Sequence, residues 1–194
     1  KQTKETMKKG KANLQHIIEG CQKGDRQCQK EVFEIFYRKM LGVCFRYAID
    51  ADEAKDMVQE AFILAYQKIN DYAGKGSFEG WLRRIVVNKS IDIIRRKKMN
   101  TFSIDAYEGY DLEQEEEDDA SIYSGIKKEI IFEAIQKLSP AYKAVFNLYV
   151  IEGYSHQEIA DELEISVGTS KSNLAKARGK LKHELKKHLN YQNV

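Results

Sequence analysis

Polar and basic side chains recur near the end of this chain at the spacing of one helical face. At about 100° per residue, this face holds Thr169, Asn173, Lys176, Lys180, His183 and Lys187. The opposite face holds Leu174, Ala177, Leu181 and Leu185. Hydroxyl, amide and ammonium groups bind base edges and phosphates, whereas aliphatic side chains need a core. The pattern predicts a helix that packs on one side and enters a DNA groove with the other.

The residues before this helix predict the element that positions it. Ser155 and Glu158 form a capping-box pattern that begins a short helix. The segment from Leu163 to Ser166 interrupts that helix, and Ser166 can cap the next one. A short helix, a tight turn and a longer basic helix are typical of a DNA-reading helix-turn-helix.

A second polar face is predicted on a helix over residues 78–98. Within roughly 80° of the helical wheel lie Trp81, Arg84, Asn88, Asp92 and Arg95. Guanidinium groups bind phosphates, amides read base edges, and an exposed Trp81 with Phe78 nearby could stack on an unpaired base. The alternative is a solvated face with Trp81 inside a helical bundle. This helix alone supports both interpretations equally, and the second basic helix favours nucleic-acid binding.

Carboxylates lie in the middle of a predicted helix over residues 52–69. Asp56, Gln59 and Glu60 share its polar side, with Phe62 on the apolar side. Paired carboxylates could act in acid–base catalysis, but no histidine, metal-ligand cluster or phosphate-binding glycine loop accompanies them. A protein-docking surface is favoured, and we expect no catalytic residue, metal site or cofactor.

The composition predicts an all-α protein. The chain has 194 residues, a single proline and no run of alternating β-branched residues between turns. No apolar stretch approaches the ~20 residues that span a bilayer, and no signal-like segment follows the basic N-terminus. We therefore expect a soluble, cytoplasmic protein with no membrane insertion. Cys21, Cys28 and Cys44 lack the spacing of a metal site, so we expect reduced, unpaired thiols.

Charge is distributed unevenly and predicts the domain organisation. Residues 101–125 hold nine acidic and no basic side chains, whereas residues 165–194 hold seven basic side chains and one acidic. The expected parts are a mobile basic tail over 1–12, a helical domain over 13–98, a poorly ordered acidic linker over 99–125 and a second small helical domain over 126–190. The expected helices are 13–20, 25–48, 52–69, 78–98, 126–138 and 141–151, before the helix-turn-helix. This separation of charge suits a polyanionic partner.

Several long motifs follow one another in a fixed order. They are DADEAKDMVQEAFILAY at 50–66, FEGWLRRIVVNKSIDIIRR at 78–96, LSPAYKAVF at 138–146, GYSHQEIA at 153–160 and SVGTSKS at 166–172. The first two resemble region 2 of bacterial RNA polymerase sigma factors of the extracytoplasmic-function type, and the others resemble region 4. The similarity extends from about residue 14 to residue 187. Larger members of this family carry a third helical domain where this chain has only the acidic linker.

The resemblance implies a division of labour among these motifs. Asp56, Gln59 and Glu60 would dock on the clamp coiled coil of the largest subunit of core RNA polymerase, and region 4 would contact the flap of the second-largest. The opened minus-ten element would be held by the loop over 70–77 and by Lys75, Phe78, Trp81, Arg84, Asn88, Arg95 and Arg96. The minus-thirty-five element would be read in the major groove by Thr169, Lys171, Ser172, Asn173, Lys176 and Lys180.

The resemblance also implies regulation, and the sequence departs from the family pattern at two positions. An anti-sigma factor and a specialised, stress- or envelope-responsive set of promoters are expected from the family. Asn173 stands where the family often has Arg, and Ser170 where Val is frequent. Because an amide favours adenine over guanine, we expect adenine as the base that Asn173 contacts.

Two other functional classes remain as alternatives. A helix-turn-helix regulator that is no polymerase subunit would leave the Asp56 to Phe62 motif and the Trp81 face unexplained. A nucleic-acid enzyme would need an acidic residue with a metal-binding companion, and the sequence offers none.

Overall fold

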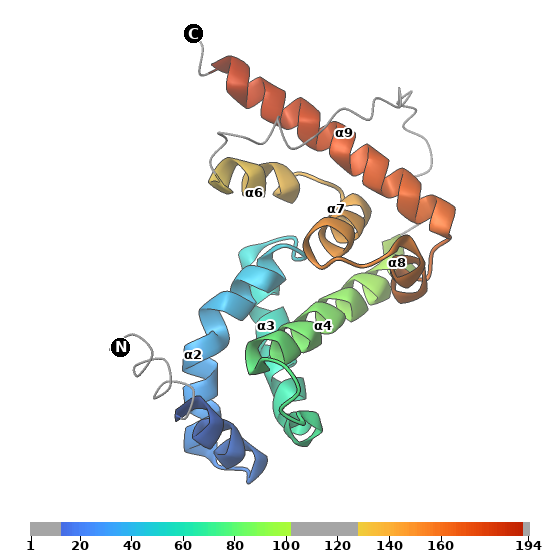
Figure 1. The fold of residues 1–194 in the computed structure, drawn as a ribbon. Coiled ribbons are helices and arrows are strands. Elements are labelled where there is room, and N and C mark those ends of the chain that lie inside the picture. Colours follow the sequence, from blue (N-terminus) through green and yellow to red (C-terminus); the bar gives the residue numbers. More distant parts are fainter. Residues whose placement is uncertain (1–12, 102–127, 192–194) are drawn as a thin grey trace. The chain divides into compact units, whose positions relative to one another are not determined.

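The computed structural model describes residues 13–101 and 128–191. These residues form helices joined by turns and loops, with no strand among them (Figure 1). The predicted all-α class is confirmed. The chain divides into two compact units, residues 1–90 and 91–194. The expectations for residues 1–12 and for most of the acidic linker lie outside the described residues.

The first unit is built from helical segments, and its first two long helices begin at side-chain caps. A helical segment over 13–22 precedes α2 (Arg26–Phe45), and α3 (Ala51–Gln67) runs into a 3-10 turn, η1 (Ile69–Asp71). The long α4 (Phe78–Thr101) begins in this unit. Asp25 begins α2 because its carboxylate accepts the backbone N–H groups of Gln27 at 2.7 Å and Cys28 at 3.2 Å.

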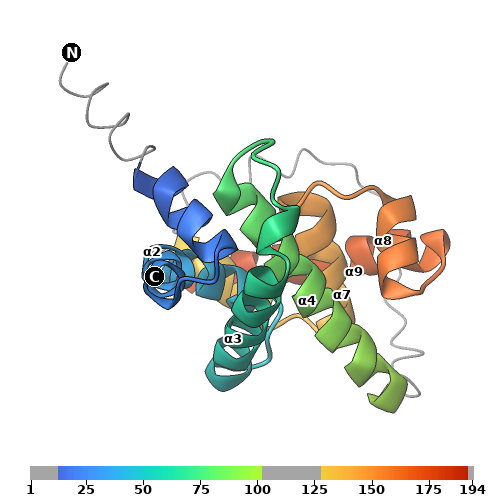
Figure 2. The same ribbon diagram turned by 90° about the horizontal axis from the view of Figure 1, so that it is seen from below.

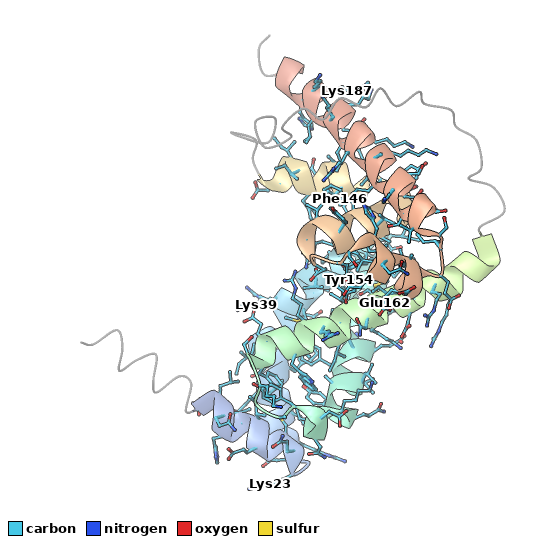
Figure 3. All side chains as sticks on the ribbon, turned by 45° about the vertical axis from the view of Figure 1, so that its right-hand side comes forward. Lys23, Lys39, Phe146, Tyr154, Glu162 and Lys187 are labelled. Carbon is cyan, nitrogen blue, oxygen red and sulfur yellow. The ribbon has the colours of Figure 1, made fainter. Side chains whose placement is uncertain are left out.

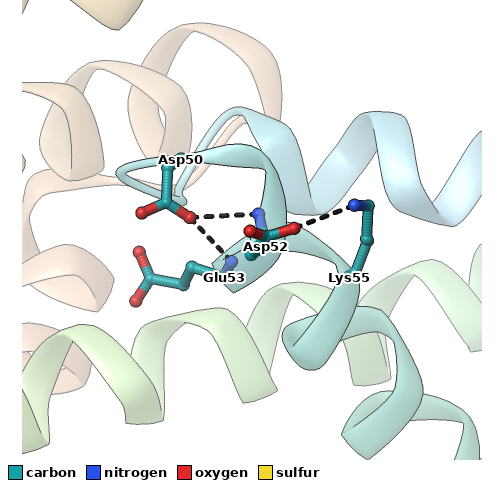
Figure 4. Close-up of polar contacts among 4 residues, drawn as sticks. All are labelled: Asp50, Asp52, Glu53 and Lys55. Carbon is teal, nitrogen blue, oxygen red and sulfur yellow. Dashed lines mark hydrogen bonds and ion pairs between the residues drawn. The ribbon is translucent and has the colours of Figure 1, made fainter.

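The start of α3 is fixed by a cluster of acidic side chains (Figure 4). One oxygen of Asp50 accepts the backbone N–H groups of Asp52 and Glu53, at 3.0 and 2.8 Å. Lys55 Nζ donates to Asp52 at 2.8 Å, and this hydrogen bond lowers the pKa of Asp52. Carboxylates also favour the positive end of the helix dipole. Together these contacts set where α3 begins and hence which way its side chains face.

Apolar side chains from α2, α3 and α4 form the core of the first unit. α2 packs against α3, and α3 lies beside the first part of α4 in both views (Figures 1 and 2). Large fully buried side chains include Val32, Met40, Met57, Phe62, Leu82 and Val86. The Tyr66 hydroxyl donates to the carbonyl of Gln29 at 2.7 Å, which adds a directional link between α3 and α2.

Burial raises the pKa of Cys44 to about 12, so that this free thiol stays protonated.

The second unit is assembled around one long helix. α9 (Val167–Tyr191) contacts α6 (Lys128–Gln136), α7 (Pro140–Phe146) and α8 (His156–Leu163). Fully buried side chains of its core include Leu148, Ile159, Leu181 and Leu185. The helix predicted over 141–151 is interrupted: α7 ends at Phe146 and continues as a π-helical turn, η2 (Asn147–Ile151). The wider turn leaves the large apolar side chains of Tyr149, Val150 and Ile151 exposed.

Candidate nucleic-acid interface

An aromatic cluster supports the start of the polar face on α4. The ring centroid of Trp81 lies 5.3 Å from that of Phe78 and 5.5 Å from that of Tyr72. Tyr72 also packs edge-on against Phe78 at 5.2 Å, and its hydroxyl donates to the carbonyl of Gly76 at 3.0 Å. Tyr72 therefore ties the loop before α4 to the half-buried Trp81, which retains an accessible part.

Phe78 lies inside the core rather than beside Trp81 on the surface. Its side chain is 3% exposed and packs on Phe36 of α2, with ring centroids 5.5 Å apart. Phe78 lies near Trp81 as the sequence predicts, but its burial leaves only Trp81 accessible at this position. Phe78 precedes Leu82 and Val86 at four-residue spacing, and this row faces inward. Its ring can support Trp81, but it does not offer a face to an unpaired base.

The remaining side chains of the α4 face differ in accessibility. Arg84, Asn88 and Arg96 are exposed, as is Lys75 in the preceding loop. Arg95 is half-buried and its Nη2 lies 2.9 Å from Asp92 Oδ1, so a neighbouring carboxylate offsets part of its charge. Cationic and amide groups thus follow Trp81 along one side of α4, as the sequence predicts.

Two ion pairs fix this face relative to the rest of the first unit. Lys89 Nζ lies 2.7 Å from Glu60 Oε2 on α3, and Lys39 Nζ of α2 lies 2.7 Å from Glu79 Oε2. The Lys89 side chain is only 17% exposed, whereas that of Glu60 is 51% exposed. The pair is partly shielded from water, so it is screened less than a fully exposed pair.

The acidic face of α3 is open to solvent. Asp56, Gln59 and Glu60 are exposed, and Phe62 is buried, as predicted. Ile63 lies one turn beyond Gln59 on the same side, and 59% of its surface is exposed. Ile63 therefore adds an accessible apolar side chain to the acidic face of α3.

The second unit contains the predicted helix-turn-helix. The Ser155 side chain accepts the backbone N–H of Glu158, and the Glu158 carboxylate accepts that of Ser155 at 2.8 Å. Glu164 ends α8 in the left-handed conformation, with φ of 53°. Ser166 Oγ then accepts the backbone N–H of Thr169 at 2.9 Å and caps α9. Both predicted caps are confirmed.

The outer side of α9 carries the predicted reading residues. Thr169, Lys171 and Lys180 are exposed, and Ser172, Asn173 and Lys176 are half-buried. Lys180 Nζ lies 5.2 Å from the centroid of the Tyr142 ring, over its face. Further cationic side chains follow along the helix, including Lys187 on its C-terminal half (Figure 3). The face combines hydroxyl, amide and ammonium groups that suit base edges and phosphates.

Ser170 differs from its neighbours because it is completely buried. Its Oγ lies 2.9 Å from His156 Nδ1 on α8. The His156 ring stacks on Tyr149, with centroids 4.5 Å apart and planes inclined by 25°. Burial, followed by the positive charges of Lys171 and Arg178, lowers the pKa of His156 and favours its neutral form. Ser170 therefore belongs to the joint between α8 and α9, and its side chain does not reach the outer face.

The described residues contain neither a metal-ligand cluster nor a membrane-spanning helix. Within residues 13–101 and 128–191, no three His, Cys, Asp or Glu side chains gather as a metal site. None of the helices in this part of the chain combines the length and the apolarity needed to cross a bilayer.

Both units are similar to known protein families. Family models match sigma-70 region 2 at residues 32–99 and sigma-70 region 4 at residues 128–181. The ECF RNA polymerase sigma factor SigW of Bacillus subtilis is 31% identical over 177 residues, covering 87% of this chain and 95% of the relative. The chain belongs to the ECF sigma factors of the sigma-70 family. The ECF sigma-E factor of Haemophilus influenzae is 28% identical over 179 residues, covering 88% of this chain and 94% of the relative.

A sigma factor of known structure is less similar in sequence to this chain than these two relatives are. The sigma factor RpoE from Bartonella quintana, in complex with the anti-sigma factor NepR, is 20% identical, with a TM-score of 0.48. The match covers 81% of this chain and 96% of RpoE.

Membership in this family confirms the predicted class of function. An ECF sigma factor is a promoter-recognising transcription initiation factor whose partners are core RNA polymerase and promoter DNA. The alternative of a helix-turn-helix regulator outside the polymerase is not favoured, because region 2 is present as well as region 4. Sigma factors as a family are non-enzymatic transcription initiation factors.

Sequence reasoning missed several residues of this sigma factor that shape its surfaces. Ile63 could have been found, because it continues the row of Asp56 and Gln59 at helical spacing. Ser170 precedes Leu174 and Ala177 on the same inner row, so periodicity also carried a signal for its burial. The position of Tyr72 between the loop and Trp81 had no such signal, since it depends on how the loop folds back.

Proposed function

We propose that this sigma factor divides promoter recognition among three helical faces. α3 docks on core polymerase through Asp56, Gln59 and Glu60, with Ile63 as the apolar part of the same surface. The loop before α4 and the outer side of α4 hold the opened minus-ten element. The outer side of α9 reads the minus-thirty-five element. The domain assignment of region 2 to 13–98, linker to 99–125 and region 4 to 126–190 belongs to this proposal.

One observation carries this proposal: α3 and α9 each bury one side in their own unit, the first part of α4 buries one side in the first unit, and each helix leaves a chemically distinct side accessible. The accessible side of α3 is acidic and apolar, which suits a protein with basic groups around an apolar contact. The sides of α4 and α9 bear cationic, amide and hydroxyl groups, which suit nucleic acid.

The minus-ten role assigns different tasks to the aromatic and charged residues of α4. The accessible part of Trp81 forms the platform for an unpaired base, supported from below by Phe78 and Tyr72. Arg84, Arg95, Arg96 and Lys75 hold phosphates, and Asn88 offers an amide to a base edge. Phe78 is thus a positioning residue here, because its ring is buried.

A pair of substitutions tests the division of labour between α3 and α4. We expect Trp81→Ala to leave binding to core polymerase unchanged and to lower promoter opening by about 5- to 150-fold, since base stacking contributes ~1–3 kcal/mol. We expect Gln59→Ala with Glu60→Ala to weaken binding to core polymerase itself. The measurements are polymerase affinity by fluorescence anisotropy and opening by permanganate reactivity of promoter thymines.

The control for these variants replaces the same residue types on another helix. Gln27→Ala with Glu34→Ala alters two exposed positions of α2 and should change neither quantity. If the Trp81 variant and the α3 variant produced the same defect, the proposed separation of docking and opening would be wrong.

Family membership supports three further parts of the proposal. The sigma factor acts in the cytoplasm, where core polymerase is found, on a stress- or envelope-responsive set of promoters. An anti-sigma factor holds it inactive by covering the polymerase-docking surface of α3 and the exposed apolar side chains of η2. A transcript map after overexpression in the native host would identify the promoters. An inhibitor that binds both surfaces should be displaced by core polymerase.

A further inference from the structure

The buried hydroxyl of Ser170 lies within the helix assigned to minus-thirty-five reading. Its neighbours Thr169 and Lys171 are exposed on the outer side, whereas Ser170 itself is 0% exposed. A buried hydroxyl without a partner is costly, so Ser170 needs the hydrogen bond that it makes to His156, at 2.9 Å. This bond joins positions 14 residues apart and links α9 to the first residue of α8.

Three elements of the second unit meet at His156. The ring belongs to α8, its Nδ1 contacts Ser170 of α9, and its face stacks on Tyr149 of η2 at 4.5 Å. The Ser155 capping box fixes the start of α8 immediately before the ring. The imidazole is therefore held on one face by an aromatic ring and along its edge by a hydroxyl.

Apolar side chains also pack α8 against α9. Ile159 and Leu163 of α8 and Leu174 and Ala177 of α9 are buried apolar side chains, and apolar packing alone tolerates small rotations and shifts. A hydrogen bond is directional and is lost when its atoms move apart. Because base contacts need positions accurate to about 0.5 Å, a directional link at the base of α9 affects how accurately its outer side chains are placed.

We propose that the hydrogen bond between His156 and Ser170, supported by Tyr149, sets the orientation of α9 and thereby the base preference of this sigma factor at the minus-thirty-five element. His156 and Ser170 are positioning residues that contact no base themselves. The inference rests on the proposed reading role of α9.

The experiment uses core polymerase reconstituted with the full chain and a promoter library randomised at the minus-thirty-five element. Base preference is measured as the ratio of occupancies among library members after sequencing the bound promoters. Ser170→Ala and His156→Ala should each change the ratio between the preferred and the next base by about two- to tenfold, the effect of one neutral hydrogen bond. The double variant should be no worse than either single variant, because both remove the same bond.

Conservative variants separate positioning from general stability. Ser170→Thr and His156→Asn keep a hydroxyl and a side-chain acceptor in these places, and at least one of them should retain the native preference. Thermal unfolding by circular dichroism verifies that each variant is folded at the assay temperature. The proposal is overturned if the Ala variants lower occupancy equally on all library members, or if the two effects add in the double variant.

A final variant distinguishes this proposal from the underlying function. Asn173→Ala removes a proposed base contact directly and should flatten the preference at its own position. If Asn173→Ala alters the preference and Ser170→Ala does not, only the positioning role is refuted. If neither variant alters it, α9 does not read this element, and both proposals are refuted.

Discussion

At the scale of single residues, the positions of a few accessible side chains depend on the buried residues near them. Trp81 rests on Phe78 and Tyr72, which place its ring at the junction of a loop and α4. Asn173 lies three positions beyond Ser170 on α9, and only the former has any exposed surface. Neighbouring residues on one helix therefore divide into those that contact the partner and those that place them.

The first residue-scale prediction concerns the base contacted by α9. Because a bidentate amide favours adenine and a guanidinium favours guanine, Asn173→Arg should shift the preferred base at one minus-thirty-five position from adenine to guanine. A change of about tenfold or more in the occupancy ratio is expected from ~1–3 kcal/mol of discrimination. Lys23→Arg, at an exposed position of the first unit, keeps the charge and should leave the preference unchanged. An unaltered preference in the Asn173 variant would exclude this residue as a base contact.

The second residue-scale prediction concerns pH. The pKa of His156 is lowered in the folded protein, first by burial and then by Lys171 and Arg178. The unfolded chain, with an ordinary pKa of about 6.5, takes up the proton first as pH falls. The stabilisation from neutral His156 is therefore complete above this value and is lost as pH falls toward the folded pKa.

The melting temperature measures this linkage. The difference between the native chain and His156→Asn should be largest near pH 7.5 and should shrink at pH 5.5, because only the native chain carries the titrating ring. A difference that stays constant across this range would show that His156 has the same pKa in both states.

At the scale of elements, a few specific contacts connect helices that the apolar core packs together. Lys89 and Glu60 join α4 to α3, and Lys39 and Glu79 join α4 to α2. Gly20 provides a close approach, since a Cβ built there would lie 2.3 Å from Cys28 Sγ and 2.9 Å from its Cβ. The helical segment over 13–22 can pack on α2 only because this position has no side chain.

Two glycine substitutions test this packing. Gly20→Ala should lower the free energy of unfolding by about 1–3 kcal/mol, because Cys28 Cβ cannot move without the backbone. Gly42→Ala, in α2 with no atom within 4 Å of the built Cβ, should raise it by about 0.5–1 kcal/mol. Urea unfolding monitored by circular dichroism gives both values. Equal effects of the two substitutions would contradict the close contact at Gly20.

At the scale of the whole molecule, charge is divided between parts of the chain. The nine acidic side chains of residues 101–125 have no basic neighbour within that segment, whereas seven basic side chains lie in residues 165–194. Carboxylates on a chain segment compete with phosphates for the same cationic side chains.

Deleting residues 101–125 tests this competition. The free protein should bind promoter DNA weakly, and the deletion should increase its affinity about tenfold at low salt, with a smaller gain at high salt because screening weakens both interactions. A variant with these carboxylates changed to amides keeps the length of the segment and should show the same gain. No gain in either variant would refute the competition.

Patterns local to the chain predicted much of the fold and of the candidate site. The caps at Ser155 and Ser166 and the inner rows of α3 and α9 follow from helical periodicity and side-chain type alone. The ion pair between Glu60 and Lys89 joins two helices whose crossing no local pattern specifies. The π-helical turn at Asn147–Ile151 depends in the same way on packing, which overrides the continuous helix that the sequence favours.

The layout of α9 also bears on engineering. The inner row of α9 packs in the core of the second unit, whereas the outer row does not. The outer side chains can therefore be substituted with little effect on folding. Orthogonal variants for synthetic circuits can be made by randomising the outer side chains while Ser170 and His156 are left unchanged. Designs that also alter Ser170 or His156 would change promoter choice and folding together, so the two properties could not be adjusted separately.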